Sequence, residues 1–175
     1  MSTRPRLRKV VLTAHITSSV GWFGAVAVFL ALAIAGLTSD EVQTVRSVYL
    51  AMESVGRFVL VPLALAALLT GLLQSLGTHW GLFRHYWILV KLILTILSTI
   101  VLLLYLQTLN QLAALAQRTS AGDGPSGLRD PSPVLHSAAA LLLLLLAATL
   151  SVYKPRGMTR YGWRKHRERL RVASP

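Results

Sequence analysis

Four long stretches of the chain are apolar and nearly free of charge, and polar segments containing Gly and Pro separate them. The stretches cover residues 10–37, 58–76, 86–109 and 134–153. Each has about 20 residues or more, and a helix rising about 1.5 Å per residue needs that length to cross roughly 30 Å of hydrocarbon. Continuous apolar runs lack the alternation of barrel strands. The pattern predicts an all-α polytopic membrane protein with four transmembrane helices in an antiparallel bundle.

The first apolar stretch, residues 10–37, follows a basic opening that resembles a secretory signal peptide. Residues 4–9 hold three arginines and a lysine, and Ala33-Ile34-Ala35 resembles a cleavage site. The apolar core of a signal peptide spans only about 7–15 residues, however, and residues 10–37 are longer. We therefore expect an uncleaved span, with a signal peptide as the alternative.

The ends of the second and third spans carry polar and helix-breaking residues. Pro62 removes a backbone donor inside 58–76, so we expect it to bend that helix. Glu53 and Arg57 lie four residues apart, the spacing of a helical ion pair. Residues 110–133 are rich in Gly, Pro, Ser and Asp, which predicts an irregular extracytoplasmic loop.

The distribution of basic residues predicts the orientation. The chain is 54% hydrophobic and 14% charged, with a net charge of +12 from 18 basic and 6 acidic residues. Segments 1–9, 77–91 and 154–175 hold 14 of the basic residues, and the connections on the other side hold four. Because basic residues collect on the cytoplasmic side, both termini are expected in the cytoplasm of a bacterial cell, with the spans in its inner membrane. The connection between the second and third spans also carries a cluster typical of an interfacial aromatic belt: Trp80, Phe83, Tyr86 and Trp87.

Composition also limits the chemistry and the partners. The chain has no cysteine, which excludes disulfides, thiolate catalysis and Cys-ligated zinc or iron–sulfur sites. The motifs of Ser hydrolases and zinc proteases are absent. The basic tail, residues 154–175, interleaves its charges with Tyr161, Trp163 and Leu170. It is expected to lie against anionic lipid headgroups rather than to bind nucleic acid.

Polar residues inside a span are the best pointers to function. His15 and Lys91 each lie five residues into a span that enters from the cytoplasm, which places them roughly 7–8 Å below the boundary. Gln74 and Thr70 fall at a similar depth in the second span. Lys91 also shares a helical face with Thr95 and Ser98, so we expect this face to point into the bundle.

Each of these residues also has a purely structural interpretation. Lys91 lies near enough to a helix end to snorkel to the interface, and His15 is suited to an interhelical hydrogen bond. The first span also carries a stripe of small residues that allows a neighbouring helix or a flat ligand to approach: Ala14, Ser18, Gly21 and Ala25. Trp22 lies two turns from His15, on nearly the same face.

The assembled motifs resemble a broad group of small bacterial membrane proteins. They are His15 and Trp22-Phe23-Gly24 in the first span, Thr70-Gly71 in the second, and Trp87-x-x-x-Lys91-Leu92 in the third. The group includes the HemJ-type protoporphyrinogen oxidases, the CopD-like copper-resistance domains and a predicted four-helix membrane family of unknown function, which the chain resembles most. In HemJ-type proteins a first-helix histidine and a third-helix lysine are functionally important and haem is bound. The resemblance implies these roles for His15 and Lys91.

The chain departs from the HemJ pattern after its Trp-x-Gly region. Residues 26–37 are wholly apolar and lack the Pro-Arg step and the Tyr-His pair found there. The resemblance therefore favours binding of haem b or a related porphyrin over porphyrinogen oxidation, and an enzyme would be a HemJ-like membrane oxidoreductase. His15 is then the expected axial ligand of the haem iron, with Lys91 as second ligand or propionate partner. Trp22, Gln74 and Thr70 are expected to line the site.

Two other functions stay open at this point. A non-enzymatic accessory subunit of a larger membrane complex would present the small-residue stripe to lipid or to a partner. A transporter or channel would need a homo-oligomer, because four spans show no inverted repeat and only Pro62 interrupts a helix.

Overall fold

The structure is a computed structural model, and it describes residues 5–77, 82–120, 124, 127–155 and 157–173. These residues form six α-helices and one π-helical segment; the described part contains no strand, only an isolated bridge between His85 and Met158. Trp80 of the expected aromatic belt lies outside the described residues. The elements are α1 (Pro5–Thr38), α2 (Val42–Val55), η1 (Gly56–Leu60), α3 (Val61–Gly77), α4 (Tyr86–Arg118), α5 (Ser132–Tyr153) and α6 (Arg160–Ala173).

Four continuous helical segments are long and apolar enough to cross a membrane, which confirms the prediction of four long apolar helices. Their bounds are Arg6–Thr38, Val42–Leu76, Tyr86–Arg118 and Ser132–Tyr153. The second segment joins α2, η1 and α3 without a break.

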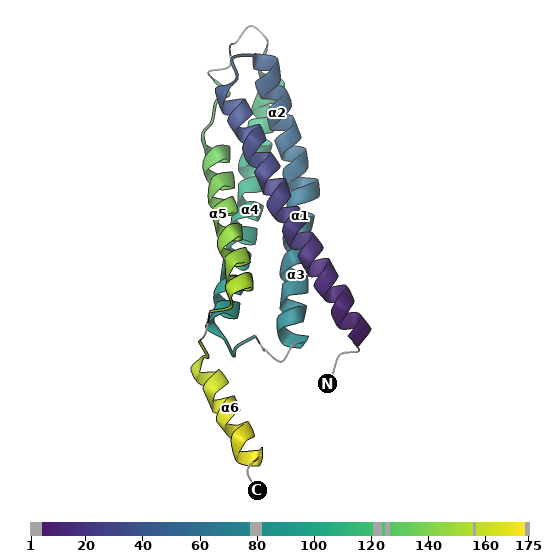
Figure 1. Cartoon of the computed structure of the whole chain (residues 1–175). Helices are drawn as coiled ribbons and strands as arrows, with labels where there is room; N and C mark the ends of the chain where they lie inside the picture. The colour runs from purple at the N-terminus through teal and green to yellow at the C-terminus, as the bar shows by residue number, and fades with distance from the viewer. Residues whose placement is uncertain (1–4, 78–81, 121–123, 125–126, 156, 174–175) are drawn as a thin grey trace.

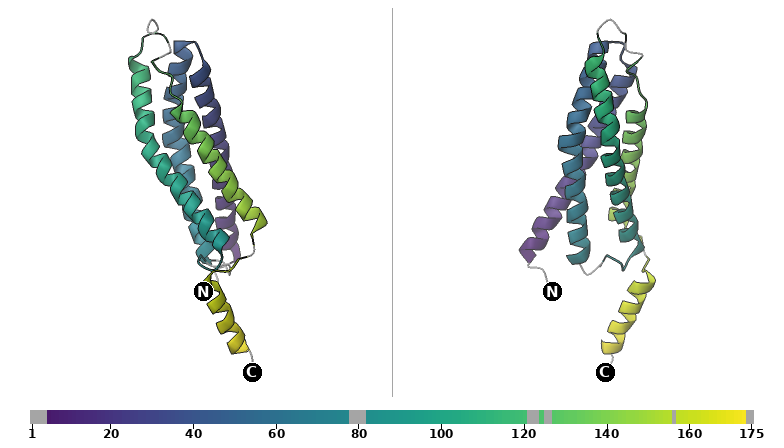
Figure 2. Two further views of the ribbon diagram at one scale, coloured as in Figure 1. Left: turned by 90° about the vertical axis from the view of Figure 1, so that its left-hand side faces the viewer. Right: turned by 180° about the vertical axis from the view of Figure 1, so that it is seen from behind.

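The helices pack in a ring in which α1 and α4 lie on opposite sides. Helix α1 packs against α2, α3 and α5, and α4 packs against the same three helices, but α1 and α4 do not pack on each other. Figures 1 and 2 show this arrangement, with the start of α1 and helix α6 at the same end of the molecule. A side chain of α1 can therefore meet one of α4 only across the centre of the ring.

The π-helical turn of η1 lies directly before Pro62, the second residue of α3. Proline has no N–H to donate, and its ring clashes with the carbonyl four residues earlier. A wider π-turn is one way for a helix to continue past such a residue. The backbone thus accommodates Pro62 without ending the helix. The predicted ion pair also forms at this turn, with Arg57 3.1 Å from Glu53 and 2.9 Å from Asn110 Oδ1.

The tightest core lies at the end of the bundle away from the termini. Helix α1 contributes residues at helical spacing, among them Trp22, Val26 and Phe29, and they belong to one buried cluster with residues of α2, α3 and α4. Val45 and Met52 of α2 are completely buried. The remaining core residues are mostly Ala and Leu from η1, α3 and α4: Leu60, Ala64, Ala67, Leu109, Leu112 and Ala116.

Helix α4 continues nine residues past the predicted end of its span at residue 109. The prediction of an irregular loop over residues 110–133 is therefore wrong for 110–118. The cause is packing, since Leu112, Ala113 and Ala116 bury a helical face against α2. The Nε of Arg46 also donates to the Ala116 carbonyl at 2.8 Å and satisfies one acceptor near the helix end.

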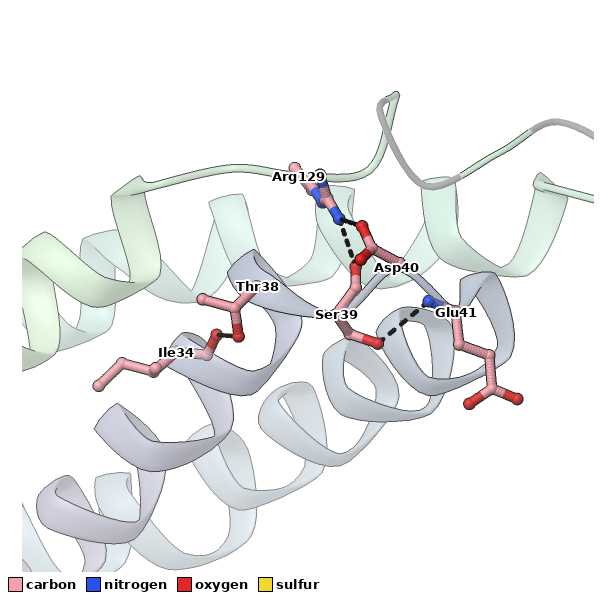
Figure 3. Close-up of polar contacts among 6 residues, drawn as sticks. All are labelled: Ile34, Thr38, Ser39, Asp40, Glu41 and Arg129. Carbon is pink, nitrogen blue, oxygen red and sulfur yellow. Dashed lines mark hydrogen bonds and ion pairs between the residues drawn. The ribbon is translucent and has the colours of Figure 1, made fainter.

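The remaining connection is fixed to the turn between α1 and α2 by Arg129 (Figure 3). Its guanidinium donates to the Ser39 carbonyl at 2.7 Å and pairs with the Asp40 carboxylate. In the same turn the Ser39 hydroxyl accepts from the Glu41 N–H at 3.2 Å. Two connections far apart in the sequence are thereby held together at one end of the molecule.

Candidate ligand site around His15

The imidazole of His15 reaches from α1 to the last turns of α3. Its Nδ1 lies 3.2 Å from the Ala67 carbonyl and 3.1 Å from the Thr70 hydroxyl. The Thr70 hydroxyl donates its own proton to the Ala66 carbonyl at 2.5 Å. Both neighbours of Nδ1 are therefore acceptors, and we assign the imidazole proton to Nδ1. The lone pair is then on Nε2, which makes no hydrogen bond to any other described residue.

Gly71 makes room for this ring. A Cβ built at Gly71 would lie 3.0 Å from Cε1 of His15 and 3.5 Å from Nδ1. The absence of a side chain lets the imidazole approach the backbone of α3 closely enough for both hydrogen bonds. The step Thr70-Gly71 thus has a physical role: one residue holds the imidazole and the next leaves the space for it.

Gln74 binds α1 one turn further along α3. Its Nε2 donates to the Val11 carbonyl at 3.3 Å. Within α1, the Ser18 hydroxyl donates to the backbone carbonyl of His15 at 3.1 Å. The predicted grouping of His15, Thr70 and Gln74 at one level is therefore present, and its members join α1 to α3.

Lys91 lies across the ring of helices, on α4. Its side chain is half-buried. Within the described residues its ammonium has no hydrogen-bond or ion-pair partner. No described contact joins Lys91 directly to His15, Thr70 or Gln74. The inward face predicted for Lys91 is supported by Ser98 two turns along α4, which is only 7% exposed.

The Ser98 hydroxyl is the buried side-chain polar atom without a partner in the described part of the chain. By contrast, Thr95 and Thr99 donate to carbonyls of their own helix, those of Lys91 and Thr95. An unpaired buried hydroxyl costs free energy. A polar ligand or water reaching this level of α4 would recover that cost.

Trp22 lies deeper on α1, about two turns from His15. It is only 3% exposed and belongs to the closed core with Val26 and Phe29. Part of the small-residue stripe packs inside the chain: a Cβ at Gly21 would lie 3.4 Å from Leu63 of α3, and Ser18 is buried. Ala14 of the same stripe is exposed, so the stripe does not serve contact between helices along its whole length.

Three groups of this site were not singled out as ligand-site residues in the sequence. Gly71 is visible in the sequence only as half of the Thr70-Gly71 motif, and the carbonyls of Val11 and Ala67 carry no side-chain signal. The spacing of Ala67 and Thr70, one turn apart on the face that meets α1, is the feature that brings their oxygens to the same nitrogen.

His136 belongs to a separate polar group at the opposite end of the bundle. Its ring stacks on Tyr105 with centroids 4.1 Å apart and planes 20° apart. Its Nδ1 lies 2.8 Å from the Ser132 carbonyl, and the Tyr105 hydroxyl lies 2.9 Å from the Ser132 hydroxyl. His136 is therefore held by Tyr105 and by the start of its own helix. Most of the length of α1 lies between the level of His15 and the level of this group. The two histidines are therefore too far apart to share a ligand.

The described residues contain no group of three or more His, Asp or Glu side chains close enough to hold a metal ion. A single imidazole such as that of His15 suits an axial ligand of a macrocycle.

Comparison with protein-family models, with curated proteins and with solved structures finds no match. The resemblance to HemJ-type and CopD-like proteins therefore stays a prediction from the motifs. The function has to be inferred from the four apolar helices and from the surroundings of His15.

Proposed function

We propose that the chain is a multi-pass protein of a bacterial inner membrane, with antiparallel spans and both termini in the cytoplasm. The excess of basic residues at one end supports this orientation. The burial of Phe29 and Ala33 in the core supports α1 as a permanent span, because cleavage near Ala35 would remove this part of the core.

In this proposal the extracytoplasmic boundary of the inner membrane lies near Arg57. The exposed positions of α2 before it are mostly polar, such as Gln43, Ser47 and Ser54. Phe58, directly after it, is 73% exposed. From Phe58 to Gly77 the helix rises about 30 Å, the thickness of the hydrocarbon layer. Helix α2 and the end of α4 then form a packed cap outside the membrane.

We infer that the inner leaflet of this bundle binds haem or a related porphyrin-like ligand through His15. The observation that carries the inference is the state of the imidazole. Nδ1 is held by the Ala67 carbonyl and the Thr70 hydroxyl, while Nε2 has no partner among the described residues. Metal-binding histidines are commonly oriented in this way, with one nitrogen bonded to a carbonyl and the other bound to the metal.

The other polar groups fit such a ligand by their chemistry. The ammonium of Lys91, which has no partner among the described residues, suits a carboxylate such as a propionate, or the second axial position. The amide of Gln74 and the hydroxyl of Thr70 keep α3 against His15. Bound haem would supply a redox-active iron, and the protein would set its potential through the ligands and their hydrogen bonds.

The test is the visible absorption spectrum of the detergent-purified protein, oxidised and reduced, before and after haemin is added. We expect a Soret band in the wild type and its loss or shift in His15→Ala. His136→Ala is the matched control, because it removes a histidine of the same chain at the opposite end of the bundle. Its spectrum should equal that of the wild type.

A featureless wild-type spectrum after haemin addition would overturn the haem proposal. Equal loss in both histidine variants would also contradict it, because binding would then depend on the fold rather than on His15. The chain would in that case be better described as an accessory subunit, to be sought by co-purification of a stoichiometric partner. A transporter or channel would instead require an oligomer in the membrane.

A further inference from the structure

Helix α6 carries a row of arginines on one exposed side. Arg160, Arg164 and Arg167 are exposed and recur at spacings of four and three residues, which places them on the same helical face. The guanidinium of Arg164 lies 6.0 Å from the ring of Tyr161, at the limit of a cation–π contact. No ion pair to any described residue neutralises these three arginines. The row is therefore a concentrated positive surface.

The first turn of α6 is fixed to the connection that leads into α4. The Thr159 N–H donates to the Arg84 carbonyl at 2.9 Å, and the Thr159 hydroxyl donates to the Phe83 carbonyl. The same hydroxyl accepts from the Gly162 N–H at 3.1 Å, which is the bond of a helix N-cap. One side chain thus starts α6 and also attaches it to the turn before α4.

We call the contact of Thr159 with Phe83 and Arg84 the Thr159 joint. Gly162 permits a very close approach between α6 and the chain at this joint. A Cβ at Gly162 would lie 2.5 Å from the Arg84 carbonyl oxygen, a distance that no side chain can occupy. The Tyr86 N–H also donates to the Gly157 carbonyl at 3.4 Å. The start of α6 is therefore held by several contacts and not only by chain connectivity.

The joint lies at the level expected for the inner lipid headgroups. Four residues close to it in the sequence expose large apolar side chains: Phe83, Tyr86, Val152 and Tyr153. Aromatic residues of this kind gather at the membrane interface. From Arg160 to Arg167 the helix rises roughly 10 Å. That length lies within the headgroup layer plus a Debye length of about 8 Å.

We propose that α6 is a binding surface for anionic lipid headgroups of the inner leaflet, with the Thr159 joint holding its arginine row at the height of the phosphates. The partner is the bilayer itself, since the aromatic residues at the joint fit a membrane interface and α6 leaves the bundle at the end where α1 begins (Figure 1). Nucleic acid would satisfy the arginines but would leave the exposed Tyr161 and Trp163 without an interface to enter.

The test compares hydrogen exchange of the α6 amides in the full chain, reconstituted in nanodiscs of phosphatidylcholine alone or with phosphatidylglycerol. We expect slower exchange with the anionic lipid and reversal in about 0.5 M salt, where screening is strong. A charge near an anionic surface contributes about 1 kcal/mol, or roughly fivefold in affinity. Three arginines therefore set an upper limit of roughly a hundredfold on the slowing.

The triple variant R160Q/R164Q/R167Q should lose this effect, because Gln keeps the helix propensity of Arg but not its charge. The matched control is R6Q/R8Q/K9Q, which removes three charges from exposed positions of α1 at the same end. The control should keep the lipid-dependent slowing. The far-UV circular dichroism of both variants should equal that of the wild type.

Equal exchange in both lipids would overturn the proposal, because the protection of α6 would then come from the joint alone. Loss of the effect in the α1 control would also contradict it, since total charge rather than the arginine row would be responsible. Slowing by a short DNA oligonucleotide, without any response to the anionic lipid, would replace the bilayer by nucleic acid as the partner.

Discussion

Gly71 leaves the space in which the imidazole of His15 binds α3: a Cβ at this position would lie 3.0 Å from Cε1 of His15. The hydrogen bonds to Ala67 and Thr70 depend on that approach. A residue without a side chain thus determines how the candidate ligand is oriented.

Gly71→Ala should therefore destabilise the protein even though alanine favours helix. The helical gain is about 0.5–1 kcal/mol, whereas forcing a packed contact apart costs about 1–3 kcal/mol. We expect a net loss of about 1 kcal/mol in the free energy of unfolding, measured by thermal unfolding in detergent.

Gly24→Ala is the control for this substitution. It lies in the middle of α1, and a Cβ there would meet nothing within 4 Å. It should leave stability unchanged or raise it slightly. If both alanine variants behave alike, the contact with His15 does not constrain Gly71.

Thr70→Val should weaken the hold on His15 without removing it. The Ala67 carbonyl at 3.2 Å still accepts from Nδ1, but the hydroxyl acceptor at 3.1 Å is lost. Loss of one such hydrogen bond costs about 0.5–1.5 kcal/mol, which chemical denaturation in detergent can measure.

Thr149→Val is the matched control because the Thr149 hydroxyl bonds only to its own helix, to the Leu145 carbonyl at 2.9 Å, and is exposed. Its cost should be smaller than that of Thr70→Val. Equal costs would mean that the contact between Thr70 and His15 adds nothing to stability.

Much of the candidate site was predictable from depth alone. Helices rise by a constant amount per residue, so counting residues from the ends of the spans placed His15, Thr70 and Gln74 at one level, and their contacts bear this out. Rotation about the helix axis was not predictable in this way, because it depends on packing between helices. Trp22, for example, belongs to the buried core, and its place beside a ligand stays a prediction.

The extent of two helices was missed for a different reason. The average composition of residues 110–133 indicates a loop, but its first nine residues contain no Gly or Pro and bury Leu112 and Ala116. The basic run after residue 154 was interpreted only through its charge. Its helix depends on the Thr159 cap and on contact with Arg84, a tertiary contact that charge patterning does not show.

Tyr105 and His136 should be energetically coupled at the opposite end of the bundle. Their rings stack at 4.1 Å, and aromatic pairs of this kind contribute about 0.5–1.5 kcal/mol beyond burial. A double-mutant cycle of Tyr105→Leu and His136→Leu, measured by denaturant unfolding, should give a coupling energy of that size.

Tyr105→Phe separates the ring from the hydroxyl. It should keep most of the coupling to His136 while losing about 1 kcal/mol from the 2.9 Å contact with Ser132. Additive costs in the cycle with leucine would show that the stacked geometry has no energetic role.

Arg129 should matter more to stability than its ion-pair partner Asp40. The Asp40 side chain is 96% exposed, and exposed pairs contribute at most about 1 kcal/mol and often nothing measurable. Arg129 also donates to the Ser39 carbonyl at 2.7 Å, a charge-assisted bond that Asp40→Asn leaves in place. We expect Asp40→Asn to cost less than about 0.5 kcal/mol and Arg129→Ala about 1–2 kcal/mol.

Arg118→Ala provides the control, because Arg118 is an exposed arginine at the same end with no ion pair to a described residue. Hydrogen exchange of the α1–α2 turn should accelerate in Arg129→Ala and stay unchanged in Arg118→Ala. Raising the salt concentration should reduce the small effect of Asp40→Asn further, because screening acts on the exposed charge pair. If Asp40→Asn costs as much as Arg129→Ala, the ion pair holds the loop in place and the Ser39 carbonyl does not.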